Sequence, residues 1–122
     1  QDIYLKKFDS SGNRLWTKQW GHSSFDFGES VTTNKLGNIY VTGEIRGGTK
    51  NSKIFENEIF LRKFNPSGNT IWTKRWGTFW GNGTGVTSDS SGNVYVTGNT
   101  QGGLDGNKHS GKYDSFLVKF SW

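Results

Sequence analysis

The chain has 122 residues, enough for one domain, and it contains 18 Gly but no Ala, Met or Cys. Missing Ala and Met together with abundant Gly, Thr and aromatic residues argue against helices, and missing Cys excludes disulfides and thiolate metal sites. The net charge of +5 comes from scattered basic residues, so we expect no nucleic-acid partner, and no apolar run is long enough to span a membrane.

The first predicted elements are two short strands, residues 3–8 and 14–20, in which strand-type residues alternate with polar ones. Residues 9–12 between them read Asp-Ser-Ser-Gly. Asp at the first position and Gly at the fourth are typical of a type I turn followed by a left-handed residue, the three-residue hairpin arrangement. The chain is therefore predicted to open with an antiparallel β-hairpin.

A second predicted hairpin follows, with one strand around Val31 and another over residues 39–42. The same turn chemistry joins them, because residues 34–37 read Asn-Lys-Leu-Gly. Two consecutive hairpins with one type of turn predict an antiparallel meander of four short strands.

The whole pattern returns with a period of about 56 residues. Residues 58–77 are identical to residues 2–21 at 12 of 20 positions, and residues 86–98 are identical to residues 31–43 at 8 of 13 positions. A fixed period of this order is typical of solenoids and propellers. We expect a single repeat module over residues 1–122, made of repeats 2–57 and 58–113 and the start of a third repeat, 114–122.

The predicted fold class is all-β, with antiparallel four-stranded meanders stacked as propeller-type blades. In the strand 14–20, Leu15 and Thr17 point to one face while Trp16 and Trp20 point to the other, so both faces carry bulk. Stacking such sheets face to face buries both faces and leaves only short edges. Two repeats are too few to close a ring, so we expect the chain to join copies of itself or further blades of a longer chain.

Two recurring motifs carry a family resemblance. They are W-x-x-x-W-G at residues 16–21 and 72–77, and G-N-x-Y-V-T-G at residues 37–43 and 92–98. With these motifs, nearly the whole chain resembles the bacterial seven-bladed β-propeller repeat family, known as the SBBP repeat. The resemblance implies an extracellular or cell-surface protein that carries an array of blades, usually without an assigned catalytic activity.

The resemblance also implies an order of strands within each blade. The strand near Val31 or Val86 is then first and innermost, the G-N-x-Y-V-T-G strand second, the F-L-x-K-F strand third and the Trp strand outermost. By this order the chain holds two outer strands, one whole blade and the first three strands of another. Either it is an excerpt of a longer array, or the end strand 114–122 pairs with another chain, which closes a ring or propagates a filament.

The leading functional hypothesis is a structural and interaction module of an extracellular or cell-surface protein that either associates with itself, with a filament as one outcome, or is part of a longer array of blades. It is expected to need no cofactor and no metal. Blade packing by the repeated Trp residues and by the last strand is predicted to carry the assembly. These residues are Trp16, Trp20, Trp72, Trp76, Phe116, Leu117 and Phe120.

The sequence does not predict an enzyme, because no nucleophile is paired with a base and no acid with a second carboxylate. Asp26 and Glu29 are close in sequence, but the second repeat is expected to have Asn82 and Gly85 in their places.

The alternative hypothesis is a carbohydrate-binding lectin assembled from two-blade protomers. Two loops that precede an innermost strand carry ring side chains beside Asp or Asn, and such groups suit the apolar face and the hydroxyls of a sugar. The candidate glycan contacts are Phe25, Asp26, Phe79, Trp80 and Asn82. Packing of these rings between blades is the other interpretation. Asn82-Gly83-Thr84 is also an acceptor sequon, so Asn82 is a candidate for glycosylation.

Overall fold

The structure is a computed structural model that describes residues 1–21, 25–46, 57–77, 80–101 and 113–121. The described residues form strands and turns, and they contain no helix that is able to cross a membrane. In chain order the strands are β1 (Ile3–Phe8), β2 (Arg14–Trp20), β3 (Asp26–Thr33), β4 (Ile39–Arg46), β5 (Asn57–Phe64), β6 (Thr70–Trp76), β7 (Gly81–Ser88), β8 (Val94–Thr100) and β9 (Asp114–Phe120). The predicted all-β fold class is confirmed.

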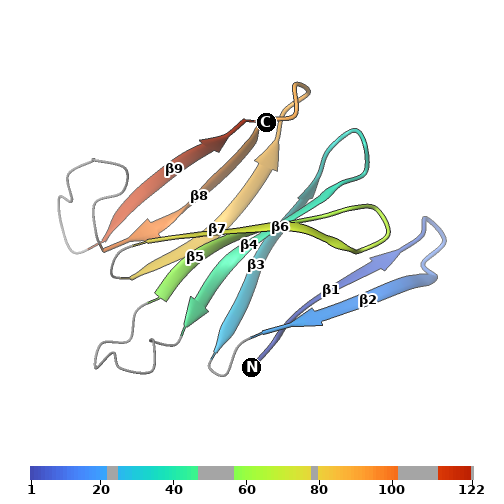
Figure 1. The fold of residues 1–122 in the computed structure, drawn as a ribbon, viewed down its shortest axis with the longest axis horizontal. Coiled ribbons are helices and arrows are strands. Elements are labelled where there is room, and N and C mark those ends of the chain that lie inside the picture. The colour runs from blue at the N-terminus through green and yellow to red at the C-terminus, as the bar shows by residue number, and fades with distance from the viewer. Residues whose placement is uncertain (22–24, 47–56, 78–79, 102–112, 122) are drawn as a thin grey trace.

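The strands form three antiparallel sheets that lie side by side in chain order (Figure 1). Sheet A consists of β1-β2, sheet B of β3-β4-β5-β6 and sheet C of β7-β8-β9. This arrangement confirms the predicted division into two outer strands, one whole four-stranded sheet and three strands of another. Sheet B takes its first two strands from one sequence repeat and its last two from the next, so the sheets are offset from the repeats by two strands.

The four tight turns inside the sheets share one pattern of hydrogen bonds. The side-chain oxygen of the first turn residue accepts the backbone N–H groups of the residues two and four positions later, at 2.9–3.0 Å. The fourth turn residue is a Gly with φ between 82° and 88°, in the left-handed region. The predicted turn chemistry is confirmed at Asp9, Asn34, Asn65 and Asp89.

The turn that begins at Asp89 is expected to make the stability of the fold depend on pH in acid. The side-chain hydrogen bond from Asn93, joined by bonds from its backbone N–H and from the Tyr95 hydroxyl, lowers the pKa of Asp89 from 3.8 to about 2. Because the folded pKa is the lower one, Asp89 stabilises the fold above pH 3.8, and this contribution is lost as the pH falls towards 2.

We expect an NMR titration of the Asp89 carboxyl carbon to give a midpoint near 2. The Asp89→Asn variant is the matched control, because Asn34 and Asn65 occupy the equivalent turns, and it is expected to keep the turn while losing this part of the acid dependence. A wild-type midpoint at the ordinary value of 3.8 would contradict the assignment.

Two apolar clusters join the three sheets. Between sheets A and B, the cluster consists of Ile3, Ile39, Val41, Ile45, Phe60 and Phe64, with Leu5, Trp16 and Trp20 packed against it. Between sheets B and C, it consists of Tyr40, Leu61, Val94 and Val96, with Trp72, Trp76, Val86, Phe116 and Phe120 packed against it. Sheet B therefore buries both faces, and its strand β4 is buried at every residue from Ile39 to Ile45.

A β-bulge interrupts the first strand of sheets B and C at the same place. The register shifts after Gly28 in β3 and after Gly83 in β7. In sheet B the carbonyl oxygen of Phe27 occupies the space that a Cβ on Gly43 would need, and Gly98 is confined in the same way in sheet C. The last Gly of the G-N-x-Y-V-T-G motif is therefore required by a close approach of two backbones.

Candidate functional site

The two end sheets are incomplete versions of sheet B. Sheet A has only the strands that correspond to β5 and β6, so the edge of β1 that faces a β4-type strand in sheet B is open within the described part of the chain. Sheet C has the strands that correspond to β3, β4 and β5, so the outer edge of β9 is open there too. Each open edge presents backbone groups that a further strand can pair with.

A groove lies beside each open edge. The larger one has a volume of about 610 Å³ and lies between β1 and the part of β3 from Asp26 to Val31. The smaller one has a volume of about 310 Å³ and is lined by Lys74, Arg75, Trp76, Val118 and Phe120, from β6 and β9. By comparison with sheet B, these grooves lie where the absent strands of sheets A and C would pack.

The structure places the four repeated Trp side chains between neighbouring sheets. They are Trp16, Trp20, Trp72 and Trp76. The ring of Trp20 lies 5.2 Å from that of Phe64 in sheet B, and the ring of Trp76 lies 5.4 Å from that of Phe120 in sheet C. The two contacts are equivalent, because both partners are shifted by one repeat. In each repeat, the Trp strand packs against the third strand of the next sheet.

Strand β9 has one covered face and one open face. Phe116 and Phe120 point to the covered face, where both contact Trp76. Leu117 points the other way and is 72% exposed, whereas its counterpart in β5, Leu61, is fully buried under sheet C. Leu117 therefore lies on the face against which a further sheet would pack.

The outer face of sheet A is exposed in the same way. Tyr4 is 69% exposed and Phe8 is 54% exposed, whereas their counterparts in sheet B, Phe60 and Phe64, are each 1% exposed. Aromatic side chains that are core residues in the middle sheet are thus left open at the end of the stack, which is typical of an interaction surface.

The residues predicted to contact a sugar form two groups. One group lies at the start of β3, and the other lies at the start of β7 and in the segment before it. Phe25 is 56% exposed, but Asp26 beside it is buried. The ring of Trp80 packs edge to face against Tyr113 at 5.4 Å. Phe79 lies outside the described residues. Among the four described candidates, Asp26 is therefore withdrawn from the surface and the ring of Trp80 is in contact with Tyr113.

The strand registers change the expected equivalence of the two loops. Asp26 pairs with Ile45 in β4, and Gly81 pairs with Thr100 at the same place in β8, so the repeats are 55 residues apart here. The expected match of Asp26 with Asn82 is therefore wrong, because the segment between β6 and β7 is one residue shorter than the segment between β2 and β3. A buried carboxylate in one blade has no side-chain counterpart in the next.

The same shift applies to the other acid and to the sequon. Glu29 corresponds to Thr84 and not to Gly85. Asn82 lies in β7, and its side-chain oxygen is buried and has no hydrogen-bond partner among the described residues. Glycosylation of Asn82 stays a prediction.

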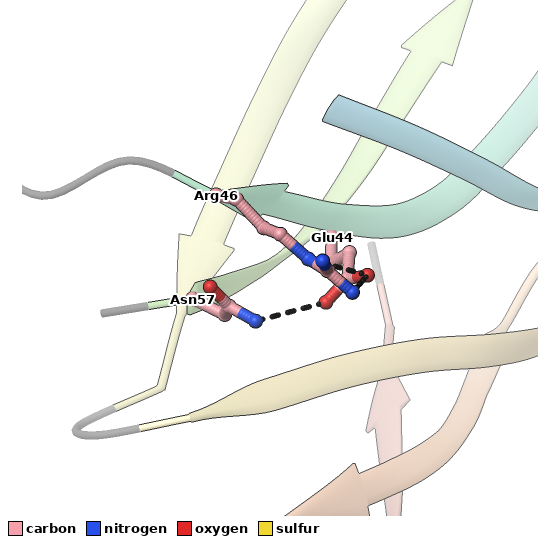
Figure 2. Close-up of polar contacts among 3 residues, drawn as sticks. All are labelled: Glu44, Arg46 and Asn57. Atoms are coloured by element: carbon pink, nitrogen blue, oxygen red, sulfur yellow. Dashed lines mark hydrogen bonds and ion pairs between the residues drawn. The ribbon is translucent and has the colours of Figure 1, made fainter. Parts of the chain in front are cut away.

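Sequence patterns did not indicate the buried acid in sheet B. Glu44 is 2% exposed and accepts hydrogen bonds from Arg46 Nε at 3.1 Å and Nη2 at 2.9 Å, and from Asn57 Nδ2 at 3.1 Å (Figure 2). Because it is four residues from Tyr40 on β4, it faces sheet C. Its counterpart is Asn99, so self-comparison gave no signal for it. These bonds join β4 to β5 within sheet B, on the face that packs against sheet C.

Comparison with known proteins agrees with this architecture. A family model for the SBBP β-propeller repeat matches residues 15–48 and 71–105, which together are more than half of the chain. Each match begins in a Trp strand and runs through the following G-N-x-Y-V-T-G strand. A search of curated proteins gave no match.

Proposed function

Since the chain belongs to the SBBP β-propeller repeat family, we propose that it is a structural and interaction module that associates with copies of itself by completing blades. The observation that carries this proposal is the contrast between sheet B, which has four strands, and sheets A and C, which have two and three. We place the module outside the cell or at its surface, as the resemblance implies. No catalytic step is assigned to it.

The two end sheets complement each other. Sheet C supplies the first three strands of a blade, and sheet A supplies the third and fourth. Joining sheet C of one copy to sheet A of the next therefore completes one blade and leaves one third strand over. Each copy then contributes two blades, so a closed ring has an even number of blades, and a rotation that does not close gives a filament.

The exposed end faces supply the driving force for this association. Either Tyr4 and Phe8 on β1 or Leu117 on β9, whichever strand enters the joined blade, would move from solvent into contacts that their counterparts already make around sheet B. Burying one such side chain fully contributes about 1.5–3 kcal/mol. Pairing the open edges also satisfies backbone groups that otherwise depend on water.

Light scattering over a concentration series, with electron micrographs of the same samples, tests the proposal. We expect either a discrete multiple of the 13.7 kDa chain, which means a closed ring, or filaments, which mean open addition. A folded monomer at every concentration up to the solubility limit would refute self-association.

Carbohydrate binding by the assembled module is the second candidate function. The exposed ring of Phe25 and the ring pair of Trp80 and Tyr113, at equivalent ends of β3 and β7, favour it. Glycan-array binding that is lost in Trp80→Ala and Phe25→Ala would support this function. An assembled, folded module that binds no glycan would count against it.

A further inference from the structure

When sheet C of one copy joins sheet A of the next, β9 of the first copy and β1 of the second both correspond to β5. Only one of them can pair with β8 in the completed blade. We propose that β1 takes the place: the β1–β2 hairpin of a second copy docks on β8 and displaces β9, so that β9 is a cap on the docking edge of the unassociated chain. This step rests on the proposed self-association and names the surface and the strand that make the contact.

The template for this docking lies within the chain. β5 pairs with β4 so that Leu61 lies opposite Thr42, and β9 pairs with β8 so that Leu117 lies opposite Thr97. Leu5 is the residue of β1 that corresponds to Leu61. In the joined sheet, Leu5 of the second copy therefore lies opposite Thr97, in the position that Leu117 leaves.

Packing against the next sheet favours β1 over β9, because β1 carries an isoleucine, Ile3, at a position where β9 does not. A Cβ on Gly28 would lie 2.8 Å from Ile3 Cγ2, and a Cβ on Gly83 would lie 3.1 Å from Ile59 Cγ2, so at both junctions Ile fills the space over a Gly of the next sheet. β9 carries Ser115 at this position. If β9 of the first copy took the place of β1 in the joined blade, its Ser115 would lie against Gly28 of the second copy. The smaller side chain would leave a cavity where Ile3 now packs.

A cation on the opposite face favours the same strand. In sheet B the Arg62 guanidinium lies 5.0 Å from the ring centre of Trp20. β9 places Val118 at the equivalent position near Trp76, whereas β1 carries Lys6 there. Docking of the hairpin would set Lys6 over Trp76 and restore the cation–π contact.

Moving the hairpin as one unit also keeps its internal bonds. The bond from Gln19 Nε2 to Asp2 Oδ2 at 2.9 Å stays intact, together with all β1–β2 pairs. The exposed rings of Tyr4 and Phe8 become covered by Trp76 of the first copy, as Trp20 covers the third strand of sheet B. Displacing β1 instead would break the hairpin.

Two disulfide locks test which strand moves, and the chain has no Cys of its own to interfere. Thr97→Cys with Leu117→Cys joins exposed, directly opposite residues and locks β9 on β8. The matched control, Lys6→Cys with Thr17→Cys, joins exposed opposite residues and locks β1 to β2. Thiol titration verifies closure, circular dichroism verifies folding, and light scattering gives the mass in oxidised and reduced states.

We expect the oxidised cap lock to remain monomeric, with its assembled fraction lower by about tenfold or more, and to assemble on reduction. The hairpin lock lacks the Lys6 contact with Trp76, so it should assemble less well than the native chain, but to the same extent in its oxidised and reduced states. The inference is overturned if the oxidised cap lock assembles as well as its reduced form, or if oxidation blocks assembly of the hairpin lock and not of the cap lock. If the native chain and both reduced variants stay monomeric, the proposed self-association itself has failed.

A second variant tests the contact directly and does not depend on the locks. In Thr97→Cys with Leu5→Cys, the two thiols lie in different sheets of one chain and meet only if β1 of a second copy pairs with β8. Oxidation is expected to give a ladder of covalently linked chains on a non-reducing gel. Assembled chains that give no ladder would show that β1 does not take this position.

Discussion

Replacing Gly43 with Ala is expected to lower the free energy of unfolding by about 3 kcal/mol or more. The new methyl group would collide with the carbonyl oxygen of Phe27 on the neighbouring strand. Neither backbone can move away easily, because β3 and β4 are paired on both sides of the bulge and β4 is also paired with β5. A collision between two packed backbones is not relieved by rotating a side chain.

Urea unfolding of Gly43→Ala and of a matched control gives the measurement. Gly85→Ser is the control, because Ser30 occupies the equivalent position in sheet B and a Cβ on Gly85 would only approach Thr97 Cγ2 to 3.2 Å. We expect this control to change the free energy of unfolding by less than about 1 kcal/mol. Equal losses in the two variants would show that the bulge contact is not the cause.

The strands and the turns were predictable because local chemistry specifies them, whereas the order of the strands within a blade was implied by the family resemblance. Asp or Asn followed three residues later by Gly fixes each turn within a few bonds, and the repeated motifs place the strands between turns. The bulge was not predictable, since it depends on how β3 pairs with β4, and no residue type signals a bulge by itself. Gly43 and Gly98 occupy equivalent positions in the two repeats, but this repetition alone does not indicate that a bulge lies beside them.

The candidate site was predictable in part, and the limits have a physical cause. The repetition of Trp20 and Trp76 pointed to packing positions because both repeats need the same contact. Asp26 was an expected sugar contact, but it is buried, and the burial of a residue depends on three-dimensional neighbours that the order of the sequence does not reveal. Glu44 gave no signal because its counterpart is Asn99, so one junction between sheets carries a buried acid and repetition could not disclose it.

Glu44→Ala is expected to lower the free energy of unfolding by about 2–4 kcal/mol. The substitution removes the acceptor for Asn57 Nδ2 and for the Arg46 guanidinium. Asn57 is 3% exposed, so its amide cannot regain the lost bond from water without opening the edge of sheet B. The loss should appear in urea unfolding, and the part that comes from the buried Glu44–Asn57 bond should change little with added salt, whereas the Arg46 side chain is 44% exposed and its part should be screened.

Glu58→Ala is the matched control, because it removes the same residue type from a pair with the same kind of partner. The Glu58 carboxylate contacts Arg75 Nε at 2.7 Å, but the two side chains are 38% and 40% exposed. An exposed pair of this kind contributes less than about 1 kcal/mol, and salt should reduce even this. If the two variants lose equal stability, burial between sheets B and C is not what gives Glu44 its effect. A loss confined to Glu44→Ala would show that a buried carboxylate, bonded to β5 through Asn57, stabilises sheet B.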